Sequence, residues 1–190
     1  MCERIQIPKK KEIAEIPVLA MIAFAARCAR RVQPLFVASW TDAPKNHIRA
    51  IEYAISLAEE TAKSGKQKQL GQIGTDANTA AQDATVKGND IAAYAAYSAE
   101  YALAAATSFP LIAANYIAEQ AAKAACATDK AAKAHSSKDS SYKIFLTAVW
   151  RDFDKLKNET QGKGQWYNPP ISPDFFGGLW PEGRPSGWPS

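Results

Sequence analysis

Alanine dominates the chain from Thr75 to about His135, and no other feature constrains the fold as strongly. Alanine has the highest intrinsic helix propensity, so this stretch predicts helices. Two breaks, at Gly88-Asn89 and at Phe109-Pro110, divide it into three, because glycine and proline interrupt a helix. Faces made of such small side chains let helix axes approach to near the lower end of the ~8–10 Å range of packed helices.

A further helix is predicted from about Pro17 to Phe36. Pro17 is tolerated in the first turn, whereas Pro34 is expected to bend or end the helix. Apolar residues lie on more than one of its faces, which is typical of a helix covered on several sides. We therefore expect this segment to be the central helix of the core.

Two more helices complete the pattern. One is capped by Thr41 or Asp42, contains Pro44 near its start and ends at about Ser64, before a glycine-punctuated loop over residues 65–74. The other spans residues 140–158. No segment alternates with the period of two that a half-buried strand requires. The sequence thus predicts an all-α bundle of five or six helices over residues 1–159.

The last residues, 160–190, are rich in proline, glycine and aromatic side chains, and we expect an extended tail without regular helices. The aromatic residues are too numerous to remain in water, so the tail packs across the bundle or docks on a partner. Trp180-Pro181 and Trp188-Pro189 flank Arg184 in a quasi-repeat. This repeat is either a linear recognition motif or a strap whose indoles fill grooves of the bundle.

Charge and cysteine content argue against several functional classes. The net charge of +4 is small, and the lysines lack interleaved aromatic platforms, so we expect no nucleic-acid partner. Cys2, Cys28 and Cys126 have wide, irregular spacing, which fits neither a disulfide framework nor a metal site. No apolar run suits a signal peptide or a membrane span. We expect a cytoplasmic protein without a cofactor or a membrane contact.

Arg27, Arg30 and Arg31 stand at positions i, i+3 and i+4 of the predicted central helix and share one side of it. One interpretation is a binding site for an anion or an acidic partner, since guanidinium groups pair well with carboxylate and phosphate. The other is pairing within the chain, and the candidate acids on the next helix are Asp42, Glu52 and Glu59. The second is favoured, because charged residues near a core are normally paired.

No catalytic site is predicted. Cys28 lies in mid-helix, where a thiol is not activated, so we expect a buried structural cysteine rather than a nucleophile served by His47. Tyr94 and Tyr101 either fill space beside the alanines or line a ligand pocket together with Arg27.

A stretch of about forty residues carries a family resemblance. An apolar helix with a cysteine and arginines leads to Pro34-Leu35-Phe36, then to the proline-containing cap Asp42-Ala43-Pro44 and to Arg49-Ala50-Ile51. This order, from Ala23 to Glu60, resembles the immunity-protein-five-like family, helical proteins assigned as immunity factors of bacterial polymorphic toxin systems. The chain differs from that pattern after Ile51 and in the tail.

The resemblance implies a non-enzymatic protein that binds and restrains a cognate toxin or effector. The expected partner-binding residues are Arg27, Arg30, Arg31, Trp180, Arg184 and Trp188. The alternative is a small-ligand sensor or adaptor in a bacterial defence or signalling operon, with the pocket of Tyr94, Tyr101 and Arg27. An alanine face left uncovered would imply a homo-oligomer.

Overall fold

The computed structural model describes residues 5–67, 76–110, 112–136, 139–163 and 167–189, and within them every regular element is helical. The all-α prediction is confirmed. Besides a 3₁₀ turn, Pro173–Phe176, the helices are α1 (Lys10–Ile13), α2 (Val18–Ser39), α3 (Lys45–Ser64), α4 (Asp76–Val86), α5 (Asp90–Thr107), α6 (Ala114–His135) and α7 (Asp139–Thr160). None of the described helices is long and apolar enough to cross a membrane.

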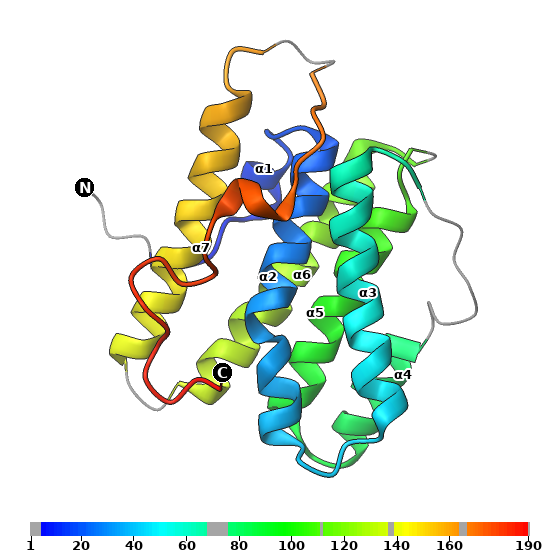
Figure 1. Cartoon of the computed structure of the whole chain (residues 1–190), viewed down its shortest axis with the longest axis vertical. Helices are drawn as coiled ribbons and strands as arrows, with labels where there is room; N and C mark the ends of the chain where they lie inside the picture. The colour runs from blue at the N-terminus through cyan, green and yellow to red at the C-terminus, as the bar shows by residue number, and fades with distance from the viewer. Residues whose placement is uncertain (1–4, 68–75, 111, 137–138, 164–166, 190) are drawn as a thin grey trace.

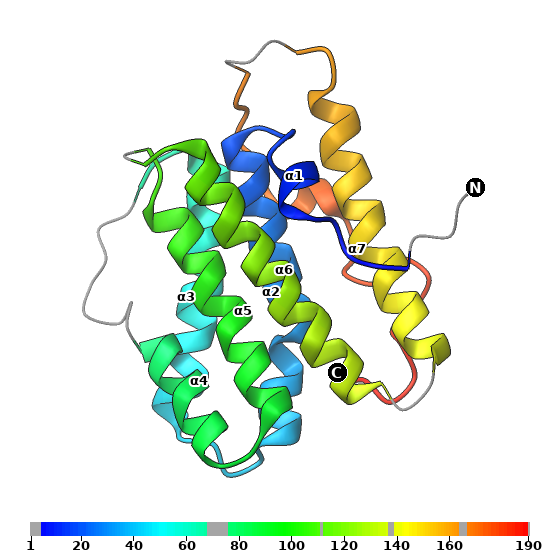
Figure 2. The ribbon, with the colours of Figure 1, turned by 180° about the vertical axis from the view of Figure 1, so that it is seen from behind.

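Helix α2 lies at the centre of the bundle, as its sequence predicts. It packs against α3 on one side and α7 on the other, with α5 and α6 behind it (Figures 1 and 2). Every residue from Leu19 to Ala29 is buried, so the helix has no solvent face over three turns. A helix that is apolar all round is expected in such a position.

Pro34 does not end α2, which was predicted to reach about Phe36. The helix continues through this proline to Ser39. Proline removes one hydrogen bond of the helical ladder, but the residues that follow bury large side chains: Leu35 and Phe36 are at most 1% exposed. Phe36 also packs on Trp40, with 5.6 Å between ring centroids. Burial of this apolar surface favours continuing the helix over ending it.

The predicted cap of α3 is also wrong. The helix begins at Lys45, and neither Thr41 nor Asp42 bonds to its first turn. Pro44 occupies the cap position, and its carbonyl accepts from the amide of His47 at 3.0 Å. The helix ends where the sequence predicts, at Gly65, whose φ of +64° suits the left-handed conformation that glycine adopts without strain.

The alanine-rich helices α4, α5 and α6 pack within the chain. Their alanines are mostly buried, so the small faces cover one another and α2 rather than remaining open to a second copy. The break between α4 and α5 lies at Gly88-Asn89, and the Asn89 side chain accepts from the amide of Ala92. Between α5 and α6, the buried hydroxyls of Ser98 and Thr128 are 2.6 Å apart.

In the described part of the tail, residues 167–189, the 3₁₀ turn lies between α7 and α2, and the residues after it cross over α7 (Figure 1). Asn168 accepts from the amide of Leu19 at 2.8 Å, and the amide of Ile171 donates to the carbonyl of Ala62 at 2.8 Å. Trp188 stacks on Phe145 of α7, with 5.9 Å between ring centroids. Trp166, one of the aromatic residues expected to pack across the bundle or dock on a partner, lies outside the described residues. The tail is thus tied to α2, α3 and α7.

Candidate functional site

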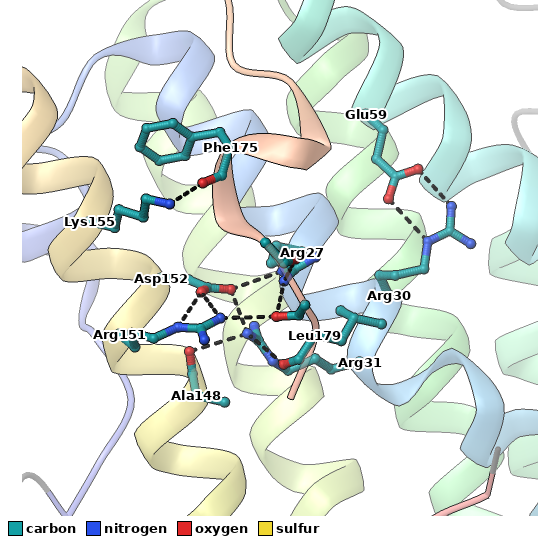
Figure 3. Close-up of polar contacts among 12 residues, drawn as sticks. Arg27, Arg30, Arg31, Glu59, Ala148, Arg151, Asp152, Lys155, Phe175 and Leu179 are labelled. Atoms are coloured by element: carbon teal, nitrogen blue, oxygen red, sulfur yellow. Dashed lines mark hydrogen bonds and ion pairs between the residues drawn. The ribbon is translucent and has the colours of Figure 1, made fainter. Parts of the chain in front are cut away.

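The three arginines of α2 separate into two environments (Figure 3). Arg30 points toward α3. Arg27 and Arg31 point toward α7 and the tail, where they meet Asp152. The i, i+3, i+4 spacing places all three arginines on one side of α2. Because α2 lies between α3 and α7, Arg30 contacts α3, whereas Arg27 and Arg31 contact α7.

Arg30 pairs with two acids of α3. Its Nε and Nη2 donate to the two carboxylate oxygens of Glu59 at 3.0 and 2.7 Å, and its Nη1 donates to Glu52 at 2.7 Å. Burial alone would lower the pKa of Arg30, but the two carboxylates outweigh it and raise the pKa. For Arg30 the predicted pairing within the chain is confirmed, through Glu52 and Glu59 and without Asp42.

Asp152 is the centre of the second environment. Its side chain is fully buried, and its Oδ2 accepts from Arg27 Nε at 2.9 Å and from Arg31 Nη2 at 2.5 Å. Its Oδ1 accepts from Arg151 Nε at 3.1 Å and Nη2 at 2.8 Å. The predicted partners of Arg27 and Arg31 on α3 are therefore wrong, because these two side chains point to α7 instead.

The tail supplies neutral acceptors to the same guanidinium groups. Arg27 Nη2 donates to the carbonyls of Gly177 and Gly178, both at 2.7 Å, and Arg31 Nη2 lies 3.3 Å from the carbonyl of Leu179. Aromatic rings cover the cations: the Arg27 Cζ is 5.2 Å from the Phe176 centroid, and the Arg31 Cζ is 5.7 Å from that of Trp180. The cluster fixes the tail to the bundle.

This geometry corrects part of the predicted partner-binding set. Arg27 and Arg31 are 8% and 1% exposed, and Trp188 is 7% exposed, so none of the three presents its polar group to a partner while the tail is in place. Trp180 is half-buried against Arg31. Arg184 is exposed and stays available for contact.

The predicted pocket of Tyr94, Tyr101 and Arg27 does not form. Arg27 lies against α7 and the tail, whereas Tyr94 faces Lys130 of α6, with 5.2 Å from Nζ to the ring centroid. Tyr101 lies against Lys123, at 5.8 Å, and stacks on Tyr97. The tyrosines cover the seam between α5 and α6, which is the space-filling role that the sequence left as the other interpretation.

Cys28 is a core residue. It is 0% exposed, and burial raises the pKa of its thiol to about 12, so it is not a nucleophile at neutral pH. His47 is buried elsewhere, with Nε2 2.9 Å from Asp83 Oδ2. In the part of the chain that the structure describes, no group of His, Cys, Asp or Glu side chains is arranged to hold a metal ion.

An apolar groove lies on the outside of the bundle, between the end of α2 and the start of α3. Its volume is about 410 Å³, and it is lined by Gln33, Pro34, Phe36, Val37, Ala38, Ile48, Ile51 and Pro189. Val37 is 43% exposed in it. On the turns of α3 that contribute Ile48 to the lining, Lys45 and Arg49 are exposed, and neither forms an ion pair or hydrogen bond with a described residue. We call this surface the α2–α3 groove.

This groove was not predicted from the sequence, because it depends on α2 continuing past Pro34 and on Pro189 of the tail lying nearby. Comparisons of the chain with protein-family models, with curated proteins and with solved structures found no match.

Proposed function

We propose that the chain is a non-enzymatic, cytoplasmic binding protein of the immunity type, which restrains a protein partner docked in the α2–α3 groove. The observation that carries the proposal is the groove itself, which is open, lined mainly by apolar residues, and has a volume of about 410 Å³. Single exposed apolar residues are common on protein surfaces, but a contiguous apolar hollow with polar groups at its edge has the composition of a binding site.

The edge of the groove indicates the chemistry of the partner. Lys45 and Arg49 are exposed and unpaired among the described residues. Glu52, the nearest acid along α3, is already engaged by Arg30 and Gln33. On the first two turns of α3 the charges left free are therefore positive, and the complementary partner is a protein segment with aliphatic or aromatic anchors flanked by Asp or Glu. Opposite charges at such a rim steer association and fix orientation.

The arginine cluster supports a docking role by elimination. Catalysis needs a reactive group that reaches a substrate. Arg27 and Arg31 both contact Asp152 beneath the tail, where no substrate reaches them while the tail is in place, and Cys28 is buried. The resemblance of residues 23–60 to immunity proteins covers the α2–α3 pair that builds the groove, so that resemblance and the geometry favour the same surface.

A photo-crosslinker placed in the groove tests the proposal. Benzoylphenylalanine is incorporated at Val37, 43% exposed, and in the matched control at Val86, which is 86% exposed on α4. Crosslinking in cells that naturally produce the chain should join one protein to position 37 and not to position 86. That protein is then purified and titrated against the wild type, Val37→Asp and Val86→Asp.

A carboxylate placed in an apolar contact costs about 1–3 kcal/mol, so Val37→Asp should weaken binding at least about fivefold, and Val86→Asp should bind as the wild type does. Cells made to produce the captured protein should be protected by the wild type and not by Val37→Asp. Equal crosslinking from both positions would contradict the proposal. So would capture of a second copy of this chain, which would make the groove a homo-oligomer interface.

A further inference from the structure

The charges beneath the tail do not balance. Arg27, Arg31 and Arg151 all contact the single carboxylate of Asp152. Their other acceptors are backbone carbonyls, those of Ala148, Gly177, Gly178 and Leu179, which are neutral. Carbonyl dipoles satisfy hydrogen bonds but do not cancel a charge. Three positive groups therefore share one negative group, and two of the three, Arg27 and Arg31, are closed to solvent, which is costly unless a further anion is present.

Arg31 shows where a further acceptor is missing. Its Nε and Nη1 are buried and have no hydrogen-bond partner. Asp152 cannot serve them, because its two oxygens already accept four bonds from the three guanidinium groups. Buried donors without a partner are rare in folded proteins, and each one calls for an explanation such as a bound ion or an ordered water.

We propose that the cluster of Arg27, Arg31 and Arg151 binds a small inorganic anion of the size of chloride. Such an ion accepts from the unpartnered donors of Arg31 and offsets the excess positive charge, whereas a water molecule would do only the first. A small ion is required because Phe176 and Trp180 of the tail lie over Arg27 and Arg31. Burial lowers the pKa of Arg27, Asp152 raises it, and the charges of Arg31 and Arg151 lower it.

Because the site forms only when the tail lies on α2 and α7, the anion binds the folded chain and not the unfolded one. A ligand of this kind stabilises the fold by RT ln(1 + [L]/Kd), so stability rises with its concentration. The site is separate from the α2–α3 groove, and the inference does not depend on the proposed function.

Thermal unfolding of the full chain in two sodium salts tests the inference. Sodium chloride replaces sodium gluconate, whose anion is too bulky for the site, at constant ionic strength. The midpoint should rise with chloride concentration. In parallel, the ³⁵Cl NMR line of the solution should broaden in the presence of the native protein and sharpen when the protein unfolds.

Three variants locate the site. Arg31→Met should abolish both effects. Since this variant removes a buried partner of Asp152 and risks not folding, Arg151→Met is the second test. Arg151 has 32% of its side chain exposed, and its loss leaves Asp152 paired with Arg27 and Arg31. It should at least halve the ³⁵Cl broadening. Arg184→Met, at an exposed position of the tail, is the matched control and should behave as the wild type does.

Identical midpoints in chloride and gluconate would overturn the inference and would show that water alone serves Arg31. An equal loss of broadening in Arg184→Met and Arg151→Met would overturn it as well, because chloride would then be held by general surface charge.

Discussion

Asp152→Asn is the substitution that most directly tests how the tail is held. The side chain of Asp152 is fully buried and accepts four hydrogen bonds from three arginines. Asparagine keeps one oxygen but turns the other acceptor into an NH₂ group that faces guanidinium donors. About half of the four bonds are lost, each worth about 1.5–3 kcal/mol when a charged group is involved. Breaking a buried ion pair costs about 3–5 kcal/mol, in agreement with that sum.

The free energy of unfolding from urea titrations, followed by far-ultraviolet circular dichroism, measures this loss. For a domain of this size, a destabilisation of about 3–5 kcal/mol corresponds to a melting temperature roughly 6–20 °C lower. The control is Glu159→Gln on the same helix, which removes an exposed ion pair with Lys163. Exposed pairs contribute little, so the control should unfold as the wild type does.

The tail should respond together with the bundle. Because Asp152 orients the guanidinium groups that bind the tail carbonyls, proteinase K should cleave residues 167–189 faster in Asp152→Asn than in Glu159→Gln. A loss of stability below about 1 kcal/mol, with unchanged cleavage of the tail, would refute the assignment of Asp152 as the group that holds α2, α7 and the tail together.

Three further outcomes follow from burial and pKa. In a Cys2→Ser background, a disulfide reagent should modify the exposed Cys126 of the native protein. It should modify Cys28 only after unfolding, because burial raises the pKa of that thiol to about 12. Two reactive thiols in the native state would contradict this. For Glu52, burial alone would raise the pKa, but the guanidinium group beside it outweighs this and lowers it. A lowered pKa stabilises the folded state at pH values above the unfolded pKa of 4.5, and this stability is lost as pH falls through the folded pKa. When the urea midpoint is plotted against pH, Glu52→Gln should therefore show a smaller fall at acid pH than the wild type does. Trp188→Ala should cost about 3–5 kcal/mol in urea unfolding, since the indole is 7% exposed, and a change below about 1 kcal/mol would mean that the tail end is not packed.

The helices could be predicted because their signals are local. Alanine content, Gly65, Gly88-Asn89 and Phe109-Pro110 act on the backbone within a few residues, and the structure places helix breaks at each of them. The two differences, at the far end of α2 and at the cap of α3, lie where local preference competes with burial. The apolar residues after Pro34 pack into the core, and their packing was not visible in the sequence.

The pairing of the arginines could be predicted only in part. Glu52 and Glu59, the partners of Arg30, lie 22 and 29 residues away on the next helix. Asp152, the partner of Arg27 and Arg31, lies 125 and 121 residues away, and no local pattern links such distant positions. One signal was present: Asp152 follows Val149 by three residues and precedes Leu156 by four, so it lies on the buried stripe of α7. An acid on such a stripe indicates a buried cationic partner.

The position of the tail determines which surfaces of this chain are open to a partner. The tail covers Arg27 and Arg31 with its carbonyls and aromatic rings, which removes them from solvent. It also brings Pro189 to the α2–α3 groove, where this residue forms part of the lining. Both effects require the tail to lie on the bundle, so release of the whole tail would expose the arginines and alter the groove together. A partner that binds the groove with Pro189 in place therefore stabilises the closed tail, and by thermodynamic linkage a closed tail strengthens binding of that partner.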